Sequence, residues 1–215
     1  MDKGKIIEDE SFKIIEKNLN LEGLSEEKRL LITKLAHATG DIDFTKTIVF
    51  SDSAIKKGIV ALKKGSTIVC DVMMVKSGIT KRYNKKTKVY CFINDQSIID
   101  IAGLTNQTRA EVSIEAASIK FNDCLYVIGN APTALMKLIE LYEKGKVNPS
   151  LVVAFPVGFV SAEEAKERLI KTDLPFITNR GTKGGSAAAA TVCNALLYLA
   201  NFSHFNINDN DIDIV

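Results

Sequence analysis

The chain has 215 residues, of which 46% are hydrophobic and 25% are charged, and its formal net charge is +2. This is the composition of an ordinary globular protein, and so small a net charge argues against a nucleic-acid or membrane-surface partner. No apolar run approaches the length of a membrane span, and the N-terminal residues are charged rather than apolar, so we expect a cytoplasmic protein.

The four cysteines form no C-x-x-C pair, and the first three lie in apolar runs. We therefore interpret them as small buried hydrophobic side chains. The chain contains no metal-ligand or redox motif, so we expect no metal site and no cofactor.

Helices and strands alternate along the chain. Apolar periodicity, capping residues and terminal glycines predict helices over residues 11–19, 25–40, 52–65, 94–103, 108–119, 132–142, from 161 onward and 184–200. Among the signals are an N-cap at Ser25, a stop at Gly40 and a capping-box pattern formed by Ser161 and Glu164. Strands are predicted over residues 47–50, 67–72, 88–93, 124–128, 151–155 and 175–178.

The predicted strands are continuous apolar runs, which is typical of strands buried on both faces of a parallel sheet. Right-handed crossovers then give a three-layer α/β/α fold with a mainly parallel sheet, in which ligands bind at the carboxyl ends of the strands. We expect a single domain over residues 1–203, followed by a polar C-terminal tail over residues 204–215.

One of the two histidines, His37, lies at the end of a predicted helix, whereas His204 lies in the polar tail. Histidine is the side chain best suited to exchange protons near neutral pH, so His37 is the candidate acid or base. A histidine at this position can also serve only to interact with the helix dipole.

The segment from Arg180 to Ser186 combines two cations with three glycines at the start of a helix. Lys183, Gly184, Gly185 and Ser186 form a candidate anion site, since glycines allow close backbone approach and a helix start presents free N–H groups. The order of residues is neither that of a P-loop nor that of a dinucleotide fingerprint. A glycine-rich turn with solvated charges is the alternative.

Three further polar residues are candidate ligand-binding residues only if they lie near His37 or the glycine-rich segment. Arg109 opens a helix and could hold a carboxylate, although pairing with Glu111 or Asp100 is the simpler interpretation. Ser11 and Thr80 are ordinary hydroxyl side chains when considered alone. From the residues alone, the sequence predicts an α/β ligand-binding protein with one acid–base histidine and several anion-friendly loops.

Taken together, seven segments resemble the precorrin-8X methylmutases, including the cobalt-precorrin-8 methylmutases, in the same order along the chain. They are Ser11-Phe12, residues 37–41 (HATGD), 77–80 (SGIT), Thr108-Arg109, 129–135 (GNAPTAL), 155–160 (FPVGFV) and 181–186 (GTKGGS). The resemblance covers about residues 5 to 200.

The resemblance implies a flavodoxin-like fold, a homodimer with the pocket near the subunit boundary, and a role in cobalamin biosynthesis. The implied reaction moves a methyl group from C-11 to C-12 of a corrin precursor, with or without cobalt, to give cobyrinic or hydrogenobyrinic acid. His37 matches the catalytic histidine, as general acid, and Ser11 and Thr80 match hydroxyls that line the pocket. The carboxylates of such a substrate suit Arg109, Lys183 and the backbone near Gly184, Gly185 and Ser186.

Two other functions remain open at this point. One is a tetrapyrrole carrier on the same fold, without catalysis. The other is an enzyme acting on a phosphate-containing ligand, held at the helix start formed by Gly184, Gly185 and Ser186.

Overall fold

The computed structural model describes residues 3–202, and the predicted tail over residues 204–215 lies outside them. Within this part of the chain, six strands form one sheet in the order β1-β6-β5-β4-β2-β3. They are β1 (Ile48–Phe50), β2 (Ile68–Cys70), β3 (Val89–Tyr90), β4 (Leu125–Ile128), β5 (Leu151–Ala154) and β6 (Phe176–Asn179). All neighbouring pairs are parallel except β1 with β6. The predicted mainly parallel sheet is therefore confirmed, with one reversed edge strand.

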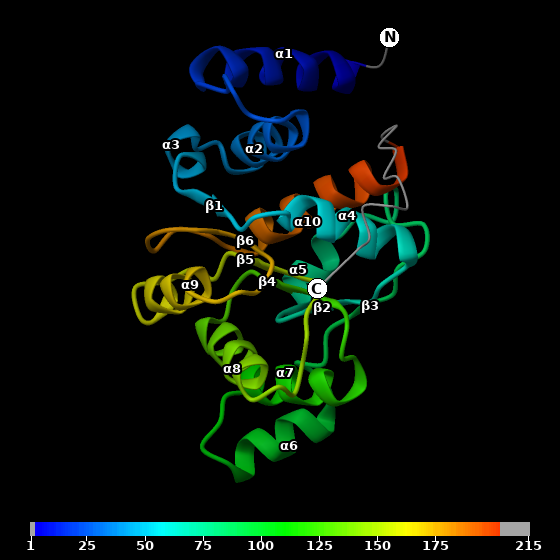
Figure 1. Cartoon of the computed structure of the whole chain (residues 1–215), viewed down its shortest axis with the longest axis vertical. Coiled ribbons are helices and arrows are strands. Elements are labelled where there is room, and N and C mark those ends of the chain that lie inside the picture. The colour runs from blue at the N-terminus through cyan, green and yellow to red at the C-terminus, as the bar shows by residue number, and fades with distance from the viewer. Residues whose placement is uncertain (1–2, 203–215) are drawn as a thin grey trace.

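Helices cover both faces of this sheet (Figure 1). On one face lie α4 (Ala54–Lys64), α5 (Met73–Gly78) and α10 (Ser186–Phe202), and on the other lie α7 (Arg109–Lys120), α8 (Pro132–Glu143) and α9 (Ala162–Ile170). The remaining helices in the described chain are α1 (Lys3–Asn18), α2 (Glu26–Thr39), α3 (Ile42–Thr45) and α6 (Gln96–Leu104). The three-layer arrangement expected from the sequence is confirmed.

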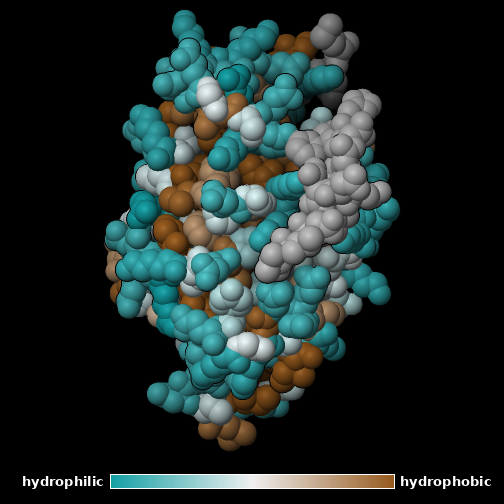
Figure 2. Space-filling model, viewed as in Figure 1, coloured by the Kyte–Doolittle hydropathy of each residue, from teal (hydrophilic) through white to brown (hydrophobic). Residues whose placement is uncertain are grey.

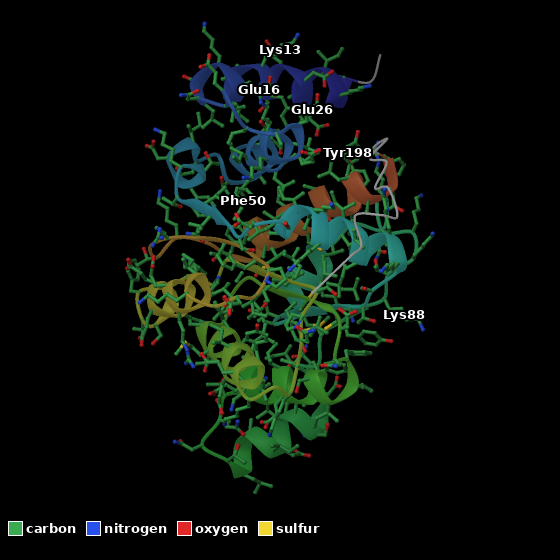
Figure 3. All side chains as sticks on the ribbon, in the orientation of Figure 1. Lys13, Glu16, Glu26, Phe50, Lys88 and Tyr198 are labelled. Atoms are coloured by element: carbon green, nitrogen blue, oxygen red, sulfur yellow. The ribbon has the colours of Figure 1, made fainter. Side chains whose placement is uncertain are left out.

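Two helices extend this arrangement outward, because α2 packs on α10 and α1 packs on α2 (Figure 1). Lys34 of α2 joins all three helices, since its Nζ lies 5.3 Å from the ring centroid of Phe12 in α1 and 5.7 Å from that of Tyr198 in α10. Tyr198 projects from α10 toward α2 (Figure 3). These cation–π contacts add to the apolar packing that places α1 and α2 above the sheet.

The core is divided by the sheet into two apolar clusters. Because successive side chains of a strand point to opposite faces, Val127 and Val153 contribute to the cluster under α10, whereas Tyr126 and Val152 contribute to the cluster under α8. All four cysteines are buried and free, which confirms their interpretation as core side chains.

The local signals of the sequence are correct at several helix ends and wrong at others. Ser25 caps α2 by accepting a hydrogen bond from Lys28 N, and Gly40 ends it in the left-handed conformation. No helix was predicted over residues 42–45 or 73–78, which form α3 and α5, and the helix predicted over residues 11–19 begins at Lys3. Ser161 has a φ of 60° and makes no side-chain cap hydrogen bond, so the predicted capping box is absent there.

Several large apolar side chains of the described chain are exposed, and two groups of them lie close together in the sequence. One is the outer helix α6, where Ile99, Ile101 and Leu104 are exposed, and Figure 2 shows apolar surface at that end of the molecule. The other is the loop after β5, where Phe159 is 95% exposed and Val160 is 81% exposed. None of the helices in residues 3–202 is long and apolar enough to span a membrane.

Candidate active site

His37 lies in the last turn of α2, where its exposed side chain meets two residues of α1. The hydroxyl oxygen of Ser11 is 2.8 Å from Nδ1 of His37, and the ring of Phe12 meets the imidazole edge-on with a centroid distance of 5.3 Å. These two contacts orient the imidazole ring. Because Nδ1 is engaged by Ser11, Nε2 is the nitrogen that is left to act on a ligand.

The loop after α2 connects the histidine to the glycine-rich segment before α10. Asp41 follows Gly40, caps α3 through a hydrogen bond from Phe44 N, and forms an ion pair with Lys183. The hydrogen bond from Lys183 lowers the pKa of the Asp41 carboxyl. The side chain of Lys183 is 61% exposed. Its ammonium group has three donors, so it can bind Asp41 and an incoming carboxylate together.

The glycines before α10 allow the backbone to pack closely against the end of β5. A Cβ atom on Gly184 would collide with the carbonyl oxygen of Phe155, and Gly185 N donates to the same oxygen at 2.7 Å. The N–H of Gly185 is therefore already used within the protein, which removes it from the backbone donors expected to bind substrate. Ser186 begins α10 in a buried position, against Gly129 at the end of β4.

Thr80 and Arg109, the other two candidates, lie on different elements. Thr80 follows α5, and its N–H donates to Oδ1 of Asn194 in α10 at 2.9 Å. Arg109 is the first residue of α7 and its side chain is exposed. Its expected partner Glu111 forms a capping box with Thr108 instead, so the predicted pairing of Arg109 with Glu111 is wrong. Among residues 3–202, no carboxylate lies within 4.0 Å of the Arg109 guanidinium.

Arg180, one of the two cations in the predicted anion-binding segment, forms an ion pair with α9 instead. Its Nη1 atom donates to both carboxylate oxygens of Glu167 in α9, at 2.5 and 2.6 Å. Its backbone N–H donates to Thr47 O at 2.9 Å. Arg180 therefore ties the loop after β6 to the surface of α9, whereas Lys183 faces Asp41.

Asp71 is a buried carboxylate at the end of β2 that the sequence analysis missed. It accepts three backbone hydrogen bonds of 2.8–3.0 Å, from Gly129, Asn130 and Ala131. Burial raises the pKa of this carboxyl, while the three N–H donors oppose that change. Asp71 thus holds the loop between β4 and α8. The available signal was an acidic residue directly after an apolar strand.

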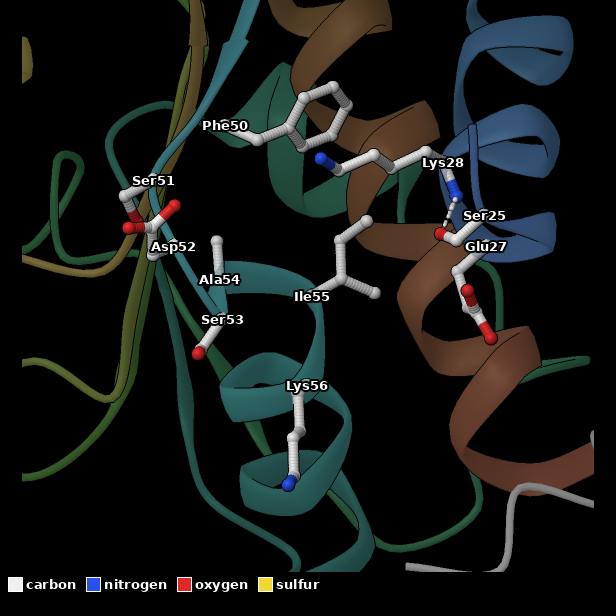
Figure 4. Close-up of a pocket in the computed structure, with 10 residues that line it drawn as sticks. All are labelled: Ser25, Glu27, Lys28, Phe50, Ser51, Asp52, Ser53, Ala54, Ile55 and Lys56. Atoms are coloured by element: carbon white, nitrogen blue, oxygen red, sulfur yellow. Dashed lines mark hydrogen bonds between the residues drawn. The ribbon is translucent and has the colours of Figure 1, made fainter. Parts of the chain in front are cut away.

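A cavity of about 210 Å³ lies between the start of α2 and the start of α4 (Figure 4). Its lining includes Lys28, Phe50 and Ile55. Ser25, which also lines it, is 12 residues from His37, or roughly 18 Å along α2. Small-molecule pockets typically enclose roughly 300–1,000 Å³, so this cavity is too small for a tetrapyrrole. It is separate from the candidate site.

Comparisons with known proteins agree on one family. A model of the family described as precorrin-8X methylmutase matches residues 6–199. A cobalt-precorrin-8 methylmutase of Leptospira interrogans is 41% identical over 92% of this chain and 94% of its own, and one from Priestia megaterium is 38% identical over 91% and 88%.

Solved structures agree with this result. A structure described as precorrin-8X methylmutase from Thermus thermophilus superposes with a TM-score of 0.85, at 32% identity, over 91% of this chain and 96% of its own. The relatives are named for an isomerase activity, which confirms the enzyme class expected from the sequence. The chain belongs to the precorrin-8X methylmutase family of cobalamin biosynthesis.

Proposed function

We propose that this protein moves a methyl group from C-11 to C-12 of cobalt-precorrin-8 or precorrin-8X, to give cobyrinic or hydrogenobyrinic acid, with His37 as general acid. The observation that carries the proposal is the exposed imidazole of His37, whose Nδ1 is engaged by Ser11 so that Nε2 can meet the macrocycle. The family assignment supplies the class of reaction.

In this mechanism, Nε2–H of His37 donates its proton, or a strong hydrogen bond, to the conjugated ring. The ring then becomes electron-poor, which favours migration of the methyl group: the bond to C-11 breaks as the bond to C-12 forms. The proton returns to His37 when the product forms, so substrate and product have the same composition. General acid assistance of this kind is typically worth about 10²–10⁴ in rate.

The Ser11 hydroxyl accepts a hydrogen bond from Nδ1–H of His37, both while the imidazole is protonated and after Nε2 has given up its proton. Substrate carboxylates bind the exposed cations of Lys183 and Arg109, and Thr80 orients the ring. No cofactor takes part, and any cobalt belongs to the substrate.

We further propose that the protein acts as a homodimer in the cytoplasm, with the pocket near the subunit boundary. His37 and Lys183 are both exposed in the single chain. Phe159 and Val160 are also exposed, on the loop after β5. This loop is joined to the glycine-rich segment, because Gly158 N donates to Thr182 O. Large apolar side chains beside a site usually become covered by a ligand or a partner. Light scattering of the purified protein tests the dimer, and a monomer at micromolar concentration would contradict it.

The test of the function is a visible absorption time course under anaerobic conditions. The parent protein and His37→Asn would each be mixed with cobalt-precorrin-8, with Lys171→Met as a surface control. We expect a shift to the corrin spectrum with the parent and the control, and binding without turnover with His37→Asn. Turnover by His37→Asn at the parental rate would exclude His37 as the acid.

The same experiment separates the other functions. Binding without a spectral shift in any of the proteins would favour a tetrapyrrole carrier. No spectral response at all would favour an enzyme that binds a phosphate-containing ligand at the start of α10.

A further inference from the structure

Lys166 in α9 is a buried lysine without an ionic partner among residues 3–202. The residue has no exposed surface, and no carboxylate lies within 4.0 Å of its ammonium group in that part of the chain. Loss of hydration lowers the pKa of Lys166 to about 8, although Glu163 and Glu167 act in the opposite direction. Burying an ammonium group in this way costs free energy unless its donors are used.

Its donors are directed at the loop that carries Lys183. Nζ of Lys166 donates to the carbonyl oxygen of Lys183 at 2.7 Å and to Oδ1 of Asn179 at 3.3 Å. Nδ2 of Asn179 donates to the same Lys183 oxygen at 2.9 Å and to Arg180 O at 2.8 Å. Two buried side chains, from α9 and from the end of β6, therefore converge on one backbone oxygen.

Other hydrogen bonds hold this loop at the residues on either side of Lys183 and Gly184. Thr182 O accepts from Gly158 N at 3.1 Å, and Gly185 N donates to Phe155 O at 2.7 Å. A loop carbonyl can ordinarily be satisfied by water, so hydrogen bonding does not require a buried cation at this point. What the buried cation adds is a rigid position for the backbone of Lys183, since the donor comes from a packed helix.

We propose that Lys166 is a positioning residue, which holds the backbone of Lys183 so that the Lys183 ammonium group meets a carboxylate of the substrate. This inference rests on the proposed function, because it assumes a substrate rich in carboxylates. Lys166 itself is buried behind the loop and makes no contact with the substrate.

Kinetics with cobalt-precorrin-8 give the first test. Lys166→Met keeps the length and apolar stem of the side chain but removes its donors, and Lys171→Met, at the exposed end of α9, is the matched control. We expect KM to rise about tenfold and kcat to change much less, because the displaced ammonium group of Lys183 binds the substrate carboxylate less well, while Lys171→Met is unchanged. An unaltered KM in Lys166→Met would overturn the proposal.

A double-mutant cycle separates positioning from a general loss of stability. Lys183→Ala should raise KM in the parent but add little in the Lys166→Met background, because the side chain there is already misplaced. Independent, additive effects would show that Lys166 does not act through Lys183.

Hydrogen exchange in the substrate-free protein keeps this inference distinct from the proposed function. Amides of residues 182–185 should exchange faster in Lys166→Met than in the parent or in Lys171→Met, and equal exchange would overturn the proposal even in an active enzyme. If the parent fails to convert cobalt-precorrin-8, the proposed function fails while exchange still reports on Lys166. If Lys166→Met does not fold, Lys166→Gln, whose shorter side chain no longer reaches the Lys183 carbonyl, is used for the same measurements.

Discussion

The hydroxyl oxygen of Ser11 lies 2.8 Å from Nδ1 of His37, although the two residues are on different helices. This contact assigns a role to α1, which packs on α2 at the outside of the molecule. A helix far from the sheet thus supplies the group that selects which imidazole nitrogen is available for chemistry.

Ser11→Ala should lower kcat about fivefold with little change in KM. The reason is that the imidazole loses the hydrogen bond that fixes its ring and its tautomer, which is worth about 1 kcal/mol. Steady-state kinetics measure the effect, and Ser53→Ala is the control, because Ser53 makes no cap hydrogen bond. Unchanged kcat would mean that Phe12 alone orients the ring.

Two arginines should respond differently to removal. Arg109→Ala should raise KM about tenfold, because its exposed guanidinium is available for a substrate carboxylate. Arg180→Ala should leave KM within about twofold, because Arg180 is engaged by Glu167. Kinetics on both variants test the assignment. A larger effect of Arg180→Ala would reverse it.

Gly184→Ala should destabilise the protein by about 2–4 kcal/mol and lower its activity. The added Cβ would collide with the Phe155 carbonyl, and the backbone on both sides is held by hydrogen bonds. Thermal unfolding measures the loss. Gly103→Ala is the control, since nothing lies within 4 Å of a Cβ there, and it should be neutral or slightly stabilising.

Asp71→Asn should destabilise the protein by about 2–3 kcal/mol. An amide oxygen is a weaker acceptor than a carboxylate, and the amide NH2 would face the N–H donors of Gly129, Asn130 and Ala131. Chemical denaturation of the variant checks this, with exposed Asp173→Asn as the control. Parental stability would show that the β4–α8 loop does not need the charge.

Lys166 should make the stability of the parent depend on pH in the alkaline range. Its pKa is about 8 in the folded protein and 10.5 when exposed, so between these values the unfolded chain binds more protons. The free energy of unfolding of the parent, relative to Lys166→Met, should therefore rise by about 2–3 kcal/mol between pH 8 and 10.5. Urea titrations across this range measure it. A constant difference, as expected for Lys171→Met, would contradict the prediction.

Much of the fold could be predicted from the sequence because its signals are local. The caps at Ser25 and Gly40 act within one turn of helix, and the apolar runs of β2, β4, β5 and β6 reflect burial on both faces of the sheet. The helix α5 was missed because its six residues are too few for a periodic pattern. At Ser161, the S-x-x-E pattern was present, but the left-handed backbone keeps the hydroxyl from capping.

For the candidate site too, some features could be predicted from the sequence and others could not. The sequence by itself determined the family and the identity of the candidates, since these depend on the order of short motifs such as residues 37–41 and 181–186. Only the tertiary structure decided their partners: Ser11 for His37, Asp41 for Lys183 and Glu167 for Arg180. It also revealed Asp71 and Lys166, whose hydrogen-bond partners are 58 and 17 residues away. No local pattern encodes these contacts, because they form only when the packed helices and the sheet bring distant segments together.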